Sequence, residues 1–488
     1  MTNDHSLSSS KPVRVRMAPS PTGFFHVGSA RTALFNYLFA KHNNGTFVLR
    51  VEDTDTQRND PEYEKIIYDA MAWLGLDADE GPKQGGEYGP YRQSERFELY
   101  REYAQKLIEA GTAYYAYETA DELTAMKAEQ AAQKQPPRYN GAHRELTVEQ
   151  RAAFEAEGRK PVIRFRVPEG TTAWPDVVRG EVSWNNKELD DFVIGKSDGS
   201  PTYNFACVLD DALMKISHVI RGEDGLSNTP RQILIYQALG FETPLFAHLP
   251  FLLGRDRSKL SKRHGAVNLL DFDTQGILPD AMFNYLALLG WNPGGGETQE
   301  IFTRDELIEK FTLEGVNKAG AIFDIEKLQW VNTQLLKAMP VDKFIELAHA
   351  QLKDIPGFGE DAGYTHRAVE LARERIHGVS DIRNGATYFF SDDYEVDPAG
   401  VAKHLTETSL PKLKQLRDRL EALTEWNHDS VEGAIRTLAS DLGIKPAELI
   451  HPSRMAVSGR TVGPSVFELL AALGRERVLR RMARVVEA

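Results

Sequence analysis

Two short apolar segments near the N-terminus, separated by one helical pattern, constrain the fold more than any other feature of this sequence. Residues 13–17 (VRVRM) alternate apolar and cationic side chains, as a strand with one buried face does. Prolines and a glycine at 18–23 (APSPTG) force a turn, and residues 30–38 then place apolar side chains at helical spacing. A second apolar run at 47–51 (FVLRV) completes a strand–helix–strand unit. Such a unit begins a parallel, doubly wound sheet.

The rest of the chain indicates that this α/β domain is interrupted and then followed by helices. Helical stretches around 120–135 and 147–158 flank short strand-like runs, and the α/β pattern returns with a strand at 217–221. After Thr303, whose partner Glu306 fits a capping box, the pattern is mainly helical. We therefore predict an α/β fold class: a Rossmann-type doubly wound parallel sheet, split by an inserted α+β domain and followed by an all-helical C-terminal half.

Composition excludes several other classes of protein. Hydrophobic residues make up 41% and charged residues 26% of the 488 residues, which provides enough apolar surface for sizeable cores. No apolar run approaches the roughly 18 residues of a membrane span. The N-terminal segment (MTNDHSLSSSK) has no signal-peptide pattern. We therefore expect a cytoplasmic protein that does not contact a membrane.

The single cysteine and the net charge narrow the chemistry. Cys207 cannot form an internal disulfide, and the 13 histidines show no clustered HxxxH spacing, so we expect no structural zinc. The net charge of −13 argues mildly against a nucleic-acid-binding protein. A local cationic patch is still compatible with that charge, because residues 475–484 contain five arginines and one glutamate.

Two motifs are candidates for phosphate chemistry. The first, residues 19–29 (PSPTGFFHVGS), lies between a predicted strand end and a helix start, where open α/β sheets bind ligands. Backbone N–H groups at that helix start suit phosphate, Gly28 lets a flat ring approach the backbone, and His26 can donate to a phosphate oxygen. An alternative is a plain turn with His26 as a helix cap. The second motif, 259–263 (KLSKR), is either a solvated basic run or a mobile cationic loop that closes on a polyphosphate.

Both motifs resemble signatures of the class I aminoacyl-tRNA synthetases, and the chain from about residue 12 onward resembles the bacterial glutamyl-tRNA synthetases. Residues 26–29 (HVGS) are similar to the HIGH sequence of that class, and residues 259–263 are similar to its KMSKS sequence. Further segments that resemble this family are 16–23 (RMAPSPTG), 50–55 (RVEDTD), 89–94 (GPYRQS), 201–206 (PTYNFA), 221–224 (RGED) and 458–461 (SGRT).

The resemblance implies five parts and one reaction. The parts are a first Rossmann catalytic half (11–105), an inserted acceptor-binding domain (106–190), a second Rossmann half (191–250), a stem-contact region with the KLSKR loop (251–330), and a helical anticodon-binding region (331–488) of two subdomains that meet near residue 385. The reaction joins L-glutamate to ATP as glutamyl-adenylate, releases pyrophosphate, and transfers glutamate to the 3′-terminal adenosine of tRNA(Glu). The substrate's own carboxylate is the nucleophile, so positioning and Mg²⁺ carry the catalysis. The implied enzyme is a monomer.

The resemblance also assigns roles to individual residues. The catalytic set is His26, Gly28, Lys259 and Lys262. The glutamate-binding set is Arg16, Ser20, Glu52, Tyr203, Cys207 and Arg221. The ATP-binding set is His26, Gly28, Ser29, Asp224, Leu252, Lys259, Leu260, Ser261, Lys262 and Arg263, and Arg375 resembles an arginine that reads the anticodon. Glu52 is the natural partner of the substrate ammonium, while Arg16 and Arg221 are either carboxylate ligands or members of structural ion pairs.

Two departures from the family pattern bear on the site. Gly225 stands where relatives often carry His or Trp, which leaves one wall of the nucleotide pocket open to question. Residues 114–119 (YYAYET) lack the cysteines with which some relatives hold zinc, so we expect ATP and Mg²⁺ but no zinc. We expect Cys207 to line the pocket as a small residue, because nothing near it in sequence activates a thiol.

Three other functions compete with tRNA glutamylation. A glutamyl-queuosine tRNA(Asp) synthetase shares the catalytic half but lacks the C-terminal half, which here comprises about 160 residues after Trp330. Glutaminyl-tRNA synthetases carry a C-terminal β-barrel, whereas 341–353, 365–376, 410–424 and 465–485 have helical apolar spacing. A non-catalytic tRNA-binding scaffold should have lost the HVGS or KLSKR motif. The sequence leaves open whether tRNA(Gln) is also charged.

Overall fold

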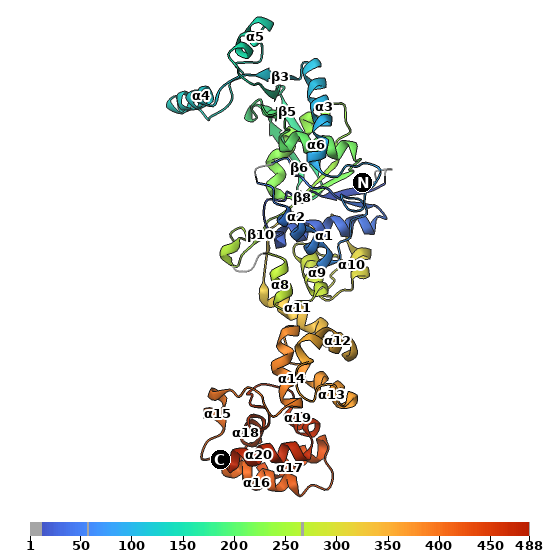
Figure 1. Ribbon diagram of the computed structural model, residues 1–488, viewed down its shortest axis with the longest axis vertical. Helices are drawn as coiled ribbons and strands as arrows, with labels where there is room; N and C mark the ends of the chain where they lie inside the picture. Colours follow the sequence, from blue (N-terminus) through green and yellow to red (C-terminus); the bar gives the residue numbers. More distant parts are fainter. Residues whose placement is uncertain (1–11, 56–57, 265–267, 488) are drawn as a thin grey trace. The chain divides into compact units, whose positions relative to one another are not determined.

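The computed structural model describes residues 12–55, 58–264 and 268–487, apart from the side chain of Lys262. The chain divides into two compact units, Met1–Asp271 with Phe283–Asp324 and Phe272–Met282 with Ile325–Ala488. The first unit contains all the strands among the described residues, and the second is helical (Figure 1). The five-part division predicted from the sequence is finer than these two units and stays a prediction.

Parallel strands form the centre of the first unit. Strands β1 (Arg14–Met17) and β2 (Thr46–Leu49) pair in parallel around helix α1 (Val27–His42), so the predicted strand–helix–strand unit is confirmed. Strands β8 (His218–Gly222) and β9 (Leu245–Leu249) also pair in parallel. A hydrogen bond from Ser217 N to Arg14 O (2.9 Å) links the start of β8 to β1.

The parallel part of the sheet is extended by a hairpin. Strands β5 (Thr171–Asp176) and β6 (Gly180–Asn185) are antiparallel, and β5 pairs with β9, which gives the strand order β6-β5-β9-β8. Other elements of the first unit are α2 (Pro61–Leu74), η1 (Gln93–Arg96), η2 (Asn186–Glu188), α6 (Tyr203–Leu213), η3 (Glu223–Asn228), α7 (Thr229–Ala238), β10 (Leu252–Leu253), η4 (Lys262–His264), α10 (Arg304–Lys310) and β11 (Ala321–Ile322). Thr303 caps α10 and shares a capping box with Glu306, as predicted.

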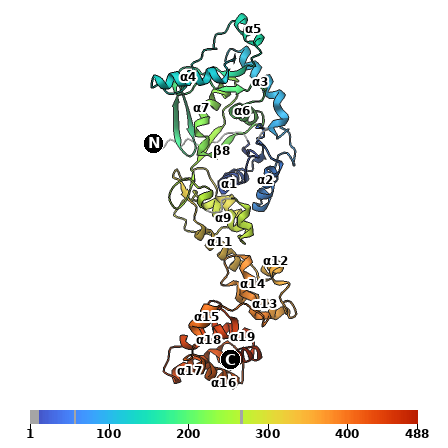
Figure 2. The ribbon, with the colours of Figure 1, turned by 60° about the vertical axis from the view of Figure 1, so that its left-hand side comes forward.

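The segment predicted as an α+β insertion, 106–190, supplies strands to two sheets, because β5 and β6 lie within it and extend the central sheet. Its other strands form a second sheet together with a strand that lies beyond residue 190. After α3 (Phe97–Glu109), strands β3 (Ala113–Ala116), β4 (Val162–Phe165) and β7 (Val193–Gly195) form an antiparallel sheet. Helices α4 (Ala120–Ala132) and α5 (Val148–Ala156) begin with capping boxes, and neither contains a buried residue. Both lie on the side of the unit that is remote from α1 (Figures 1 and 2). Their stability therefore depends on local capping more than on packing.

The second unit confirms the helices predicted for the C-terminal half and corrects one of them. The helices that run into or lie within it are α8 (Leu270–Thr274), α9 (Pro279–Leu288), α11 (Ile325–Ala338), α12 (Val341–Leu352), α13 (Ala362–Arg373), η5 (Val379–Asp381), α14 (Ile382–Phe390), α15 (Pro398–His404), α16 (Leu410–Glu421), α17 (His428–Asp441), α18 (Ala447–Ser458), α19 (Val466–Leu473) and α20 (Arg475–Val486). The single helix predicted over 465–485 is wrong. Gly474, at φ 81° and ψ 156°, separates α19 from α20, because only glycine adopts this backbone conformation without strain.

Helix α20 also changes the interpretation of the C-terminal arginine cluster. Arg481 is 1% exposed, and it donates hydrogen bonds to Asp392 Oδ1 (2.9 Å) and to the backbone oxygens of Ser391 and Val457. Arg477 donates to Tyr364 Oη (2.7 Å). These two members of the run from 475 to 484 therefore link α20 to other segments of the second unit, and the buried guanidinium of Arg481 requires such partners.

A pair of glycines in the second unit gives a test of backbone crowding. Gly276 and Gly443 both have positive φ, 77° and 63°, but a Cβ at 276 would lie 2.9 Å from Val379 N, whereas nothing lies within 4 Å at 443. Both substitutions to alanine should lower the free energy of unfolding by about 1 kcal/mol through backbone strain. Gly276→Ala should cost on the order of 1–3 kcal/mol more, because it also overpacks a closed backbone contact. Denaturant unfolding of the full chain checks this difference; equal losses at the two positions would contradict it.

Candidate functional site

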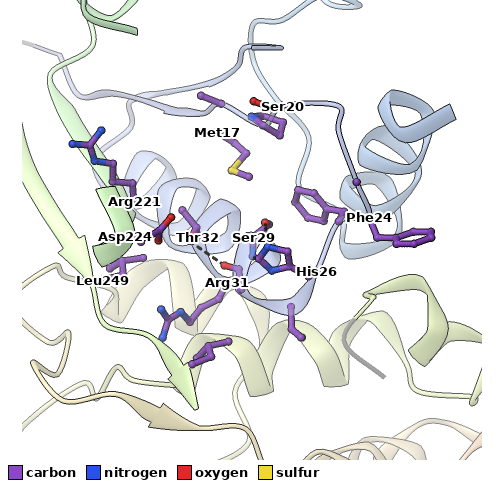
Figure 3. A pocket seen from close by; sticks show the side chains of 18 of the residues that line it. Met17, Ser20, Phe24, His26, Ser29, Arg31, Thr32, Arg221, Asp224 and Leu249 are labelled. Carbon is purple, nitrogen blue, oxygen red and sulfur yellow. Dashed lines mark hydrogen bonds between the residues drawn. The ribbon is translucent and has the colours of Figure 1, made fainter. Parts of the chain in front are cut away.

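A cavity of about 830 Å³ opens at the carboxyl ends of the central strands. Its walls come from the turn after β1, the start of α1, and the segments that follow β8 and β9. Figure 3 shows Arg221, Asp224 and Leu249 along one side and Phe24 with His26 on the other. Of the residues predicted for a site, those that line this cavity are Arg16, Ser20, His26, Gly28, Ser29, Glu52, Tyr203, Arg221, Asp224, Leu252, Lys259, Leu260 and Ser261.

The remaining predicted residues are placed elsewhere or are not described. Cys207 is 1% exposed and lies behind the cavity wall, with its sulfur 3.6 Å from Arg50 Nη2, so it does not line the cavity as expected. Arg263 is largely exposed and donates to Ser258 Oγ (2.6 Å) in its own loop. The side chain of Lys262 lies outside the described residues. Arg375 belongs to the second unit, where it lines a separate hollow of about 460 Å³.

The start of α1 is built to face an anion. His26 accepts a hydrogen bond from Ser29 N at Nδ1 (3.2 Å), so it is the N-cap, and the first turn of α1 contains no acidic residue. Burial lowers the pKa of His26, and nearby Lys259 lowers it further, against the opposing effect of Asp224. The neutral ring therefore carries its proton on Nε2, 3.2 Å from Ser29 Oγ. The predicted helix cap and the predicted ligand-facing position are thus properties of one histidine.

A second reason for glycine at position 28, besides the approach of a ligand, is the space that the His26 ring needs. A Cβ at this position would lie 3.1 Å from both Cε1 and Nδ1 of the His26 ring. This separation is tighter than ordinary van der Waals contact, so a side chain here displaces the ring that caps the helix. The HVGS segment is therefore a coupled pair, in which the glycine accommodates the histidine.

A buried network of ion pairs forms the floor behind the cavity. Asp211, on α6, accepts from Arg16 Nε (3.0 Å) and from Arg50 Nη1 (2.7 Å). Arg50 also donates to Glu52 Oε1 (2.9 Å), and a further carboxylate, Asp210, accepts from Arg96 (2.7 Å) and lies 3.8 Å from Arg50. All of these side chains are buried. The network thus brings together strand β1, the segment after β2 and helix α6.

The charges of this network balance, and burial together with the neighbouring cations shifts the pKa values of its carboxylates. Its three guanidiniums face three carboxylates, those of Glu52, Asp210 and Asp211. Although burial opposes it, the cations Arg16 and Arg50 lower the pKa of Asp211 to about 2. Burial dominates at Glu52 and raises its pKa, even though Arg50 opposes that shift. Glu52 therefore lines the cavity as a carboxylate that gains stabilisation from a further cation.

Arg221 differs from Arg16 in its partners. It donates from Nε to His248 Nε2 (3.1 Å) and from Nη2 to Thr229 Oγ1 (2.8 Å) and Gly225 O (3.0 Å). All three acceptors are uncharged, and Arg221 forms no direct ion pair with any described residue. Its Nη1 is buried with no hydrogen-bond partner in the described part of the chain. A buried donor without a partner costs about 1–3 kcal/mol, so this nitrogen gains from a hydrogen-bond acceptor that a ligand could supply.

Gly225 explains how Arg221 reaches that position. A Cβ at 225 would lie 2.5 Å from Arg221 Nε and 2.7 Å from its Cδ. The missing side chain at 225 therefore does not leave a gap in a pocket wall, because Arg221 itself occupies that space. Arg221 also lies over the ring of Phe246, with 5.5 Å between Cζ and the ring centroid.

The basic loop closes the other end of the cavity. Lys259 lines the cavity, and its Nζ lies 4.3 Å from the centroid of the Phe251 ring. The loop is held by its own polar contacts: Asp256 accepts from Ser258 Oγ (2.7 Å), and Ser261 N donates to His264 Nδ1 (3.0 Å). The KLSKR segment is thus an ordered loop at the cavity wall over its described residues, and not a purely solvated basic run.

Several residues of the site were not predicted from the sequence. Arg31 is buried in the cavity wall and donates to the backbone oxygens of Pro250 and Leu289. Burial lowers the pKa of Arg31 to about 10. For Arg31, the only signal in the sequence was a cation inside the apolar pattern of α1. For Asp211, the only signal was its position four residues after Cys207, which places both side chains on the same face of α6. Both signals are also typical of exposed helix faces.

No group of three or more His, Cys, Asp or Glu side chains among the described residues is arranged to hold a metal ion. No helix in the described ranges is long and apolar enough to cross a membrane.

Comparisons with known proteins agree with this geometry. Residues 12–330 match the family described as "tRNA synthetases class I (E and Q), catalytic domain", and residues 343–486 match "Anticodon binding domain". The chain is 49% identical over 479 residues to a glutamate–tRNA ligase of Moorella thermoacetica, with 97% of each chain covered. It is 47% identical to a glutamate–tRNA ligase of Desulforudis audaxviator, covering 97% of this chain and 96% of the relative. A crystal structure of a glutamate tRNA ligase from Elizabethkingia meningosepticum with its amino acid has a TM-score of 0.88 at 36% identity, covering 98% of this chain and all of that one.

The shared carboxylate of Asp211 gives a stability test. Asp211→Asn leaves the buried guanidiniums of Arg16 and Arg50 without their common anion, so the free energy of unfolding should fall by about 3–5 kcal/mol. Asp69→Asn is the matched control, because Asp69 is about half exposed and pairs with Lys65 along α2. The control should change stability by less than about 1 kcal/mol. Chemical denaturation checks both variants, and a loss at Asp211 no larger than the control would contradict the network.

Proposed function

The chain belongs to the class I tRNA synthetases of the glutamate and glutamine type, and on that premise we propose that it is a glutamate–tRNA ligase. It activates L-glutamate with ATP to glutamyl-adenylate and pyrophosphate. It then transfers the glutamyl group to the 3′-terminal adenosine of tRNA(Glu), and AMP leaves.

The observation that carries this proposal is the contrast between the two cavity arginines. Arg16 is already paired with Asp211 inside a charge-balanced network, whereas Arg221 has only uncharged acceptors and an unpartnered Nη1. Glutamate brings two carboxylates and one ammonium, so it carries one net negative charge. Arg221, a guanidinium without a carboxylate partner among the described residues, suits one of these carboxylates, and Glu52 suits the ammonium.

The cavity supplies positioning and charge, and no covalent nucleophile is needed. The α-carboxylate of glutamate attacks the α-phosphorus of ATP, the bond to the bridging oxygen breaks, and pyrophosphate leaves with that electron pair. The N-terminus of α1, with His26, Gly28 and Ser29, faces the nucleotide, and Lys259 and Lys262 neutralise the phosphates as negative charge moves to the leaving group. Burial raises the pKa of Cys207 to about 12, which keeps its thiol protonated and out of the reaction.

A divalent cation accompanies ATP in this proposal. Mg²⁺ is usually held by substrate phosphates and one or two carboxylates, with water completing its shell. Asp224 lines the cavity close enough to influence the pKa of His26, and it is the carboxylate that fits this role. Mg²⁺ supplies charge neutralisation at the phosphates. We expect no zinc, since the segment 114–119 has no cysteine.

The remaining partners follow from the second unit and the insertion. The second unit reads the anticodon, with Arg375 beside Lys337 and Arg373 as cations for this contact, and the insertion 106–190 binds the acceptor end. The enzyme acts as a cytoplasmic monomer. The helical C-terminal half favours this function over a glutamyl-queuosine or a glutaminyl enzyme, because 343–486 matches an anticodon-binding family and its described elements are helices.

Charging of purified tRNA tests the proposed function directly. The full chain should attach L-glutamate to tRNA(Glu) in the presence of ATP and Mg²⁺, and L-glutamine should not replace L-glutamate. tRNA(Gln), assayed beside it, determines whether the enzyme is selective for one tRNA. A protein that binds tRNA(Glu) but neither charges it nor exchanges pyrophosphate into ATP would be a scaffold, and the proposal would be wrong.

The raised pKa of Glu52 predicts a pH dependence of glutamate binding. Because burial raises this pKa, Glu52 takes up a proton at a higher pH than an ordinary glutamate, whose pKa is about 4.3. The carboxylate that attracts the substrate ammonium is then lost on mild acidification, so KM for L-glutamate should rise as pH falls. Glu52→Gln should have a high KM that changes little with pH. Glu80→Gln, which removes a carboxylate paired with Arg14 outside the cavity, should keep the wild-type profile; a flat wild-type profile would contradict this role for Glu52.

A further inference from the structure

Arg221 is held by a chain of buried groups that does not reach the cavity itself. His248, on β9, is fully buried, and its neighbour Asp176, at the end of β5, is 3% exposed. His248 Nδ1 lies 2.5 Å from Asp176 Oδ2, and His248 Nε2 lies 3.1 Å from Arg221 Nε. Neither His248 nor Asp176 lines the cavity. Any effect of these two residues on a ligand must therefore act through Arg221.

The partners of His248 determine which ring nitrogen carries the proton. A guanidinium can only donate, so Nε2 must accept from Arg221, and the proton of a neutral ring must be on Nδ1, where it is donated to Asp176. Burial lowers the pKa of His248, and Arg221 lowers it further, against the opposing effect of Asp176. Asp176 stays a carboxylate, because hydrogen bonds from His248 and from Arg179 N lower its pKa against burial. The pair is thus a neutral imidazole oriented by an anion.

Asp176 is itself fixed by the backbone. Its Oδ1 accepts from Arg179 N (2.9 Å), Val178 N (3.1 Å) and His248 N (3.3 Å), which leaves Oδ2 for the imidazole. The register of the sheet places His248 between Asp176 and Arg221, because β5 and β8 both pair with β9. Within this register, Arg221 is the direct neighbour of His248. Arg221 thereby receives one acceptor at Nε and two at Nη2, and only Nη1 remains for a ligand.

We propose that Asp176 and His248 are positioning residues that hold Arg221, through the Nδ1-protonated form of His248, in the orientation that receives a carboxylate of the amino-acid substrate. This inference rests on the proposed function, in which Arg221 binds L-glutamate. The neutral imidazole orients the guanidinium without competing for its charge, whereas a carboxylate in direct contact would neutralise the cation, as Asp211 does for Arg16.

Asp176→Asn separates positioning from packing, because the two side chains have nearly the same shape. If the amide oxygen keeps the three backbone N–H groups, its NH₂ group faces Nδ1, and His248 must move its proton to Nε2. The nitrogen Nε2 can then no longer accept from Arg221 Nε, and its proton has Thr229 Oγ1, at 3.1 Å, as its remaining acceptor. The opposite orientation of the amide sets its NH₂ group against the three backbone donors. In either case the guanidinium loses its fixed position.

Steady-state charging of tRNA(Glu) by the full-length enzyme tests the proposal. Asp176→Asn and His248→Ala should each raise KM for L-glutamate by about 10-fold or more, the size typical for a lost hydrogen bond to a charged group, while KM for ATP changes less than about twofold. His248→Gln should retain most of the glutamate affinity, since its amide can donate to Asp176 and accept from Arg221. Calorimetric titration with L-glutamate should show the same order of affinities.

Two controls make the result decisive. His218→Ala removes a different buried histidine, which lies on β8 and contacts Ser217 and Phe39 but does not line the cavity. This variant should leave KM for L-glutamate unchanged. In an Arg221→Lys background, Asp176→Asn should add little to the rise in KM, because the group that it positions is already gone. Variants that charge tRNA(Glu) with unchanged KM for L-glutamate, an equal rise in KM for ATP, or fully additive effects with Arg221→Lys would each overturn the proposal. A wild-type enzyme that charges no tRNA would instead contradict the proposed function.

Discussion

The carboxylate of Asp211, shared by two guanidiniums, is the interaction on which the floor of the site depends. Arg16 lies on β1, Arg50 directly follows β2, and Asp211 lies on α6, about 160 to 195 residues further along the chain. Removing three such charges from water is costly, and the cost is offset only when each finds a partner at close range. The network therefore makes the strand–helix–strand unit and α6 mutually dependent, and it fixes Glu52 at the cavity wall through Arg50.

Two different ways of burying a guanidinium have two different consequences. A carboxylate in contact, as Asp211 is for Arg16, offsets the charge of the guanidinium. Uncharged acceptors, as at Arg221, satisfy the N–H groups and orient the fork but leave the charge available. In the proposed function the pocket for glutamate combines both kinds, because a floor made only of ion pairs has no attraction for an anion, and a floor made only of available cations is not stable.

The nucleotide end of the cavity relies on backbone more than on side-chain charge. The open N–H groups of α1, capped by a neutral His26, face the cavity, and Gly28 leaves room for the capping ring. A neutral cap avoids placing a permanent cation where the KLSKR loop already brings Lys259. In the proposed function, the lysines of this loop neutralise the phosphates of ATP, while the helix end faces the rest of the nucleotide.

The amino-acid sequence was sufficient to predict the strand–helix–strand start and the helical C-terminal half, because both depend on local periodicity. It was also sufficient for the capping box at Thr303 and for most cavity residues near the HVGS motif, because these depend on turn residues and short spacings. It predicted one helix over 465–485, since the apolar spacing continues through Gly474, where a positive φ breaks it. Only the tertiary structure decided that Arg16 is paired and Arg221 is not, that Cys207 lies behind the wall, and that Gly225 makes room for an arginine. The physical reason is distance along the chain: Asp211, His248 and Asp176 meet their partners across strands and helices, and side-chain pairing over such separations leaves no local pattern in sequence.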